Sequence, residues 1–124
     1  MSQSWIFLGA LLGAVSVIAG AFGAHALAAR LGPRELALWE TAARYLMVGA
    51  FALILAGLFG RQRAAQGALT GAAWCLLLGS LLFSGTVFAL ALGSPRWFGA
   101  ITPIGGTLLI VGFLLFAWAA FPRP

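Results

Sequence analysis

Lysine and aspartate are absent from this sequence, and charged residues of any kind are scarce. Seven arginines and two glutamates make up 7% of its 124 residues, and the formal net charge is +5. A soluble domain carries about 25% charged residues, because these side chains supply much of its contact with water. A water-soluble fold is therefore excluded.

Groups that carry chemistry are equally few, since the chain has one histidine, one cysteine and one tyrosine. They leave no activated nucleophile, no convincing acid–base pair and no cluster of metal ligands. We therefore predict neither an enzyme nor a metal site. Cys75 lies within an apolar run, where a small buried hydrophobe is expected. A haem or chlorophyll on the one histidine is the weaker alternative, because no second ligand is available; we predict no cofactor.

Apolar residues, in contrast, are abundant: 63% of the chain is hydrophobic, and the mean hydropathy is +1.08. A transmembrane helix needs about 20 mostly apolar residues to cross a hydrocarbon core about 30 Å thick. Four segments meet this requirement, and they lack the alternation of barrel strands. We predict an all-α integral membrane protein. It is a bundle of four transmembrane helices in one domain over residues 1–124, with helices near 5–28, 33–60, 67–92 and 101–121.

Short connections rich in Gly, Pro and Arg separate these segments, so successive helices are expected to be antiparallel neighbours. Arg61, Arg63 and Arg123 then share one membrane side with the amino terminus, and the other four arginines lie opposite. The positive-inside rule counts basic residues near helix ends. We favour cytoplasmic termini, because Arg44 is expected within a helix and both glutamates lie on its side.

The arginines occur singly or in pairs between apolar runs, whereas nucleic-acid-binding proteins gather basic residues in a patch. We interpret them as loop charges that face lipid headgroups, and we predict the lipid bilayer but no nucleic acid as a partner. The lack of lysine and aspartate, with abundant alanine, glycine and arginine, is typical of GC-rich bacterial genomes. The expected location is the cytoplasmic (inner) membrane of a bacterium.

Small residues recur along the first predicted helix at spacings of four and three, which gathers them on one face. Such a face lets helix backbones approach closely, as association in lipid requires. A weaker set begins the third helix. The predicted helix-packing residues are Gly9, Gly13, Ser16, Gly20, Gly23, Gly67 and Gly71. We expect the partner helix within the same chain, and a helix of another chain is the alternative.

His25, Glu40, Arg44 and Tyr45 form a candidate polar cluster. If the first helix begins near Trp5, His25 lies about 30 Å further along it, at the membrane face where the second helix begins. Glu40 and Arg44 are spaced i, i+4 in the favourable order. Because ionisable groups near hydrocarbon are costly unless paired, we expect them to contact each other or a polar neighbour. A salt bridge with Arg44 snorkelling to the headgroups is the preferred interpretation. A proton relay or ligand site is the alternative.

The segment from Ile101 to Gly106 is interpreted as the start of the fourth helix. Thr102 suits the N-cap and Pro103 the first turn. Gly105 and Gly106, one turn further on, let another backbone or a ligand approach closely. A capped and tightly packed helix start is preferred over a binding site.

Four sequence motifs carry a resemblance to a known family: GAFGAHAL (20–27), WETAARY (39–45), FSGT (83–86) and ITPIGG (101–106). Together they resemble the domain-of-unknown-function 423 family, small bacterial inner-membrane proteins with four predicted helices. The resemblance implies the same topology and brings no activity. The family commonly has a histidine after the tyrosine, in a Tyr-x-Met-x-His-Ala pattern, where this chain has Gly49.

Taken together, these patterns favour a non-enzymatic membrane protein that acts by packing, as a homo-oligomer or as a small accessory subunit of a larger membrane complex. The alternative is a small transporter or channel that uses the polar cluster around His25 and Glu40.

Overall fold

Four long helices make up the described part of the protein. The computed structural model describes residues 2–62 and 67–122. The helices are α1 (Ser2–Phe22), continued by a π-helical turn η1 (Gly23–Leu27), α2 (Pro33–Gln62), α3 (Gly67–Ala91) and α4 (Phe98–Ala119). Each is long and apolar enough to cross a membrane. The predicted fold class, an all-α bundle of four transmembrane helices, is confirmed. Arg63 and Arg123, used above for orientation, lie outside the described residues.

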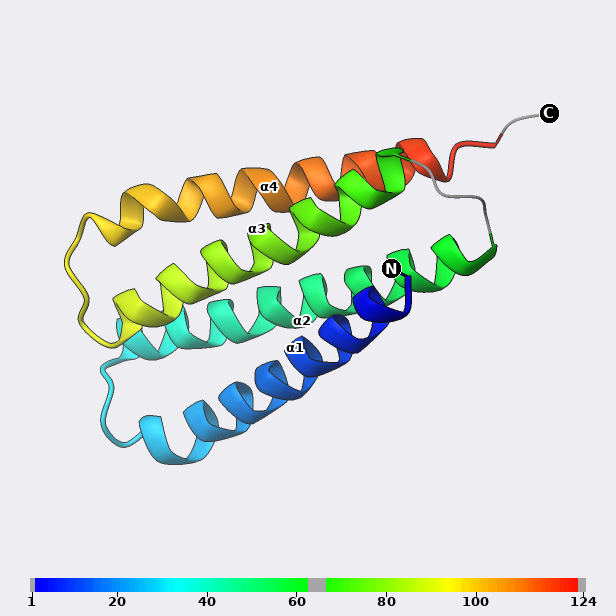
Figure 1. The fold of residues 1–124 in the computed structure, drawn as a ribbon. Coiled ribbons are helices and arrows are strands. Elements are labelled where there is room, and N and C mark those ends of the chain that lie inside the picture. Colours follow the sequence, from blue (N-terminus) through cyan, green and yellow to red (C-terminus); the bar gives the residue numbers. More distant parts are fainter. Residues whose placement is uncertain (1, 63–66, 123–124) are drawn as a thin grey trace.

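The helices lie side by side in chain order, as an open layer (Figure 1). α1 packs on α2, α2 on α3 and α3 on α4, whereas α1 and α4 form the two outer edges of the layer. Accordingly, 50% of the apolar window of α2 and 39% of that of α3 are buried, against 17% for each outer helix. We call the end with the α1–α2 and α3–α4 connections the loop face, and the opposite end the terminal face.

Both helix hairpins are held by glycines at which backbones nearly touch. At Gly9 of α1, an added Cβ would lie 2.9 Å from the carbonyl oxygen of Ala50 in α2. At Gly79 of α3, it would lie 2.7 Å from the amide nitrogen of Leu109 in α4. Contacts this short leave no room for a side chain, so the glycines set the spacing of the helices.

Apolar side chains fill the space between the two hairpins. Leu53 of α2 and Leu76 of α3 are fully buried at the centre of the core. Near the terminal face, Trp5 of α1 reaches past α2, and its ring packs edge-on against Trp74 of α3 with centroids 5.1 Å apart. Because lipid surrounds the layer, close packing of this kind stabilises the bundle more than the removal of surface from water does.

Gly93 ends α3 and turns the chain toward α4. Its φ of +92° is the only positive value among the described residues. The amide of Ser94 donates to the carbonyl of Ala89 at 3.0 Å, and that of Gly93 donates to Leu90 at 3.2 Å. This pattern is a Schellman C-cap, which satisfies carbonyls that the helix end leaves open.

Candidate functional site

The residues of the predicted polar cluster lie toward the loop-face ends of the first two helices but do not assemble. Gly23 packs on the indole of Trp39, which puts His25 near the level of Glu40. His25, Glu40 and Arg44 are exposed, and across residues 2–62 and 67–122 no hydrogen bond or ion pair joins them. The predicted contact of Glu40 with Arg44 or a polar neighbour is therefore wrong.

Both side chains lie in the first half of α2, which has 30 residues and extends about 45 Å. Glu40 and Arg44 lie about 10 and 16 Å from its start, and side chains tilt toward the amino terminus of their own helix, here toward the loop face. Because no contact joins the two among the described residues, a relay or channel through them finds no assembled pathway.

The predicted start of the fourth helix is also corrected, because α4 begins at Phe98 with Trp97 as its N-cap. Pro103 therefore lies inside the helix rather than in its first turn. Thr102 does not cap: its hydroxyl lies 2.7 Å from that of Thr86 in α3, to which it can donate while the Thr86 hydroxyl donates to the carbonyl of Leu82 at 2.7 Å. A hydroxyl that finds such partners is satisfied within the helix and no longer competes for the cap.

The two glycines of that motif behave differently. At Gly105, an added Cβ would lie 2.8 Å from the Cα of Phe83, so the backbones of α3 and α4 meet there. At Gly106, the nearest atom would be Cδ1 of Phe83 at 3.5 Å, an ordinary contact. Gly105 thus permits close packing, whereas Gly106 lies on the wall of a groove.

The small-residue face of α1 packs mostly against α2 of the same chain. Gly9, Gly23 and the buried Ser16 meet α2, and the Ser16 hydroxyl lies 3.4 Å from the sulfur of Met47. Gly13 and Gly71 have looser neighbours, at 3.8 and 3.5 Å, in α2 and α4. Gly20 and Gly67 have no atom of the described residues within 4 Å of an added Cβ, so the preferred packing within the chain finds no partner there, and packing on a helix of another chain stays a prediction for these two.

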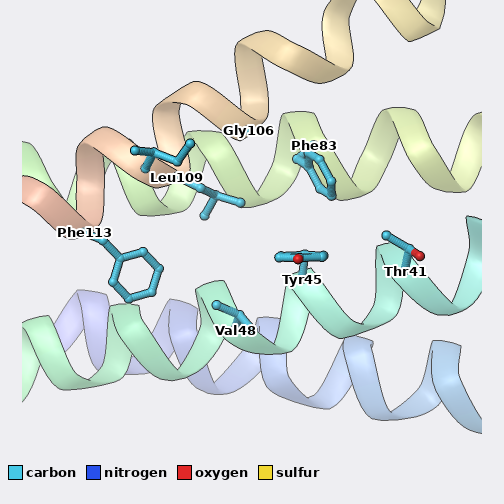
Figure 2. Close-up of a pocket in the computed structure, with 8 residues that line it drawn as sticks. Thr41, Tyr45, Val48, Phe83, Gly106, Leu109 and Phe113 are labelled. Atoms are coloured by element: carbon cyan, nitrogen blue, oxygen red, sulfur yellow. The ribbon is translucent and has the colours of Figure 1, made fainter.

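A groove of about 540 Å³ opens between α2, α3 and α4. Figure 2 shows the ring of Tyr45 on α2 facing that of Phe83 on α3, with Phe113 reaching down from α4. The two facing rings meet edge-on, with centroids 5.2 Å apart. The lining residues are Thr41, Tyr45, Val48, Phe83, Gly106, Leu109, Ile110 and Phe113. The groove has the size of a small-ligand site, and apolar side chains dominate its walls.

Sequence reasoning named two of these lining residues, Tyr45 and Gly106, but for other sites. It missed the groove because each helix contributes only one strip of its surface, and the strips meet only once the helices are packed. A usable signal was present: the motifs WETAARY, FSGT and ITPIGG each supply at least one lining residue. Because its walls come from three packed helices and combine apolar side chains with the hydroxyls of Thr41 and Tyr45, this groove is the candidate ligand site.

Gly49, the position where the family pattern has a histidine, lies buried between α2 and α3. An added Cβ would overlap the hydroxyl of Ser80 and lie 2.8 Å from its Cβ. The Ser80 hydroxyl is fully buried and donates to the carbonyl of Leu76 at 2.6 Å. The present helix spacing therefore leaves no room for a histidine at this level.

Comparisons with known proteins agree with the four-span topology. The model of a family described as "Protein of unknown function (DUF423)" matches residues 19–106. A UPF0382 membrane protein of Staphylococcus haemolyticus is 41% identical over 117 residues, which cover 94% of each chain. The UPF0382 membrane protein YwdK of Bacillus subtilis is 34% identical over 116 residues, again 94% of each chain. No solved structure matches.

The family match covers well over half of the chain, and these relatives align along nearly their whole length. The relatives are named membrane proteins, and all four helices are able to span a bilayer. This chain is therefore a multi-pass membrane protein and belongs to the DUF423 family.

Proposed function

We propose that the protein is non-enzymatic and acts by packing in the membrane, as a homo-oligomer or as an accessory subunit of a larger membrane complex. The observation that carries this proposal is a second face of α1, distinct from the one that meets α2. It exposes three alanines and one valine along the helix: Ala10, Ala14, Val17 and Ala21. Small residues at helical spacing allow another helix to approach closely. Because α1 is the outer helix of the layer, that face is free to contact a helix of another chain.

The scarcity of reactive groups supports the non-enzymatic part of the proposal. His25 and Glu40 are exposed and bond to no described side chain, so neither is held in the geometry that general acid–base catalysis needs. The same separation weakens the transporter alternative, which depends on an assembled cluster.

Affinity purification in mild detergent, followed by mass spectrometry and size-exclusion chromatography, tests the packing role. We expect an oligomer, or a foreign subunit in fixed stoichiometry. Ala14→Trp should abolish that association, because the indole prevents close approach at the small-residue face. Ala117→Trp, at an exposed alanine of α4, is the matched control and should leave it intact. A monomer without a stoichiometric partner, or equal effects of the two variants, would contradict the proposal.

We further propose that both chain ends lie on the cytoplasmic side. With Arg44 within α2, the loop side keeps three arginines near helix ends, whereas the other side has Arg61, Arg63 and Arg123 by sequence together with the amino terminus. These features support cytoplasmic termini under the positive-inside rule. In a Cys75→Ser background, Ala29→Cys at an exposed position of the α1–α2 connection should react with an impermeant maleimide on intact cells, and Ser2→Cys only after lysis. The reverse pattern would invert the orientation.

A further inference from the structure

The groove between α2, α3 and α4 runs from the loop face toward the middle of the membrane. Tyr45 and Gly105 both contact Phe83, so α2 and α4 are level at these two residues. Thr41 lies one turn, about 6 Å, toward the loop face, and Phe113 lies about 12 Å deeper. The groove is thus about 18 Å long. One leaflet of the hydrocarbon core is about 15 Å deep.

The chemistry of the groove changes along this length. Its deep part is lined by the side chains of Val48, Leu109 and Phe113. The hydroxyls lie nearer the loop face, on Thr41 and Tyr45. The Tyr45 hydroxyl forms no hydrogen bond with any described residue, so it remains a donor for a ligand. An apolar slot with a polar mouth matches an amphiphile whose tail points to the bilayer centre.

The loop face, toward which the groove opens, also carries positive charge. That side of the protein has four arginines and two glutamates; the arginines are Arg30, Arg34, Arg44 and Arg96. Arg34 is 3.7 Å from Glu35, but Arg44 and Arg96 are exposed and pair with no described carboxylate. Arg44 directly precedes Tyr45 in α2, and its side chain tilts toward the loop face. Guanidinium groups bind phosphate through charge-assisted hydrogen bonds.

We infer that this groove binds one acyl chain of an anionic phospholipid of the bilayer, with its phosphate at the arginines of the loop face. The length of the groove fits one leaflet, its walls fit a hydrocarbon chain, and its mouth fits an anionic headgroup. The site is separate from the packing face of α1 and does not depend on the proposed packing role.

Native mass spectrometry of the full chain in mild detergent tests the inference. The probes are dioleoyl phosphatidylglycerol, which is anionic, and dioleoyl phosphatidylcholine, which has the same chains and a zwitterionic head. We expect one phosphatidylglycerol adduct that binds at least about fivefold more tightly than phosphatidylcholine. Several adducts of equal affinity, or no preference between the lipids, would overturn the inference, because they indicate annular lipid only.

Two matched pairs of variants locate the lipid. Val48→Phe fills the groove and should weaken phosphatidylglycerol binding about tenfold or more, whereas Val15→Phe, at an exposed valine of α1 outside the proposed packing face, should not. Arg44→Gln should reduce the affinity about fivefold, and Arg61→Gln at the terminal face should leave it unchanged.

A second groove-filling variant keeps the test valid if the first variant does not fold. Gly106→Leu places a side chain into the same space, where an added Cβ meets only ordinary contacts, and circular dichroism checks that both variants fold. Lipid binding at the wild-type level in either folded variant would overturn the inference. So would a dimer that Val48→Phe dissociates, because a second copy of the chain would then cover the groove.

Discussion

Gly105 brings the backbones of α3 and α4 together, and its replacement by alanine measures how much this contact stabilises the bundle. The new Cβ would lie 2.8 Å from the Cα of Phe83 and 2.9 Å from the carbonyl carbon of Leu82. Carbon atoms in favourable contact are about 3.5–4.0 Å apart. Both neighbours are main chain and cannot rotate away, so the helices must separate locally by about 1 Å.

Overpacking of this kind costs about 1–3 kcal/mol. Alanine also favours a helix over glycine by about 1 kcal/mol, which partly offsets the cost. Gly106→Ala is the control that removes this ambiguity. It has the same propensity gain one residue further along, and its Cβ meets only the ring of Phe83 at 3.5 Å. We therefore expect Gly105→Ala to be less stable than Gly106→Ala by about 1–3 kcal/mol.

Unfolding by titration of SDS into mild detergent micelles gives the comparison. The five tryptophans report loss of helix packing through their fluorescence, since the helices themselves persist in SDS. The two midpoints, converted to free energies of unfolding with a shared slope, give the difference directly. A difference below about 0.5 kcal/mol would refute the conclusion that main-chain contact at Gly105 sets the spacing of α3 and α4.

Two further predictions use the same titration. Trp39→Phe should lower the free energy of unfolding by about 1 kcal/mol or more, because it removes the indole N–H that donates to the carbonyl of Ala19 at 2.7 Å and the ring atoms that pack on Gly23. Trp97→Phe, at a 61% exposed indole, is its control, and equal losses would contradict the role of the bond. Glu40→Gln should change stability by less than about 0.5 kcal/mol, because this exposed carboxylate has no bonded partner among the described residues. A loss above about 1 kcal/mol would instead reveal a structural ion pair.

The sequence predicted the number and nature of the helices because bilayer thickness imposes a length that apolar runs reveal directly. It also predicted the close approach at Gly105, since a glycine beside another helix has few other uses. The start of α4 was misplaced because Thr102 and Pro103 satisfy capping rules locally. The hydroxyl pairing of Thr102 with Thr86 depends on a helix 16 residues away, and local rules do not include it.

The polar cluster failed for a related reason. The spacing of Glu40 and Arg44 permits an ion pair, but whether one forms depends on how far each side chain lies from the headgroups. The spacing of two residues along a helix does not contain that distance. The π-helical turn η1 was likewise not predicted. Gly23, within this turn, packs directly on Trp39 of α2, and the sequence of α1 alone does not show that neighbour.

The fit of Gly49 against Ser80 links two positions that lie far apart in the chain. At the present spacing of α2 and α3, a histidine at position 49 and a serine at position 80 exclude each other. A relative with the histidine therefore needs a smaller residue across the interface or a wider gap between these helices. Positions 49 and 80 should consequently covary within the family. At the present spacing, Gly49→His in this chain should be tolerated better together with Ser80→Gly than alone.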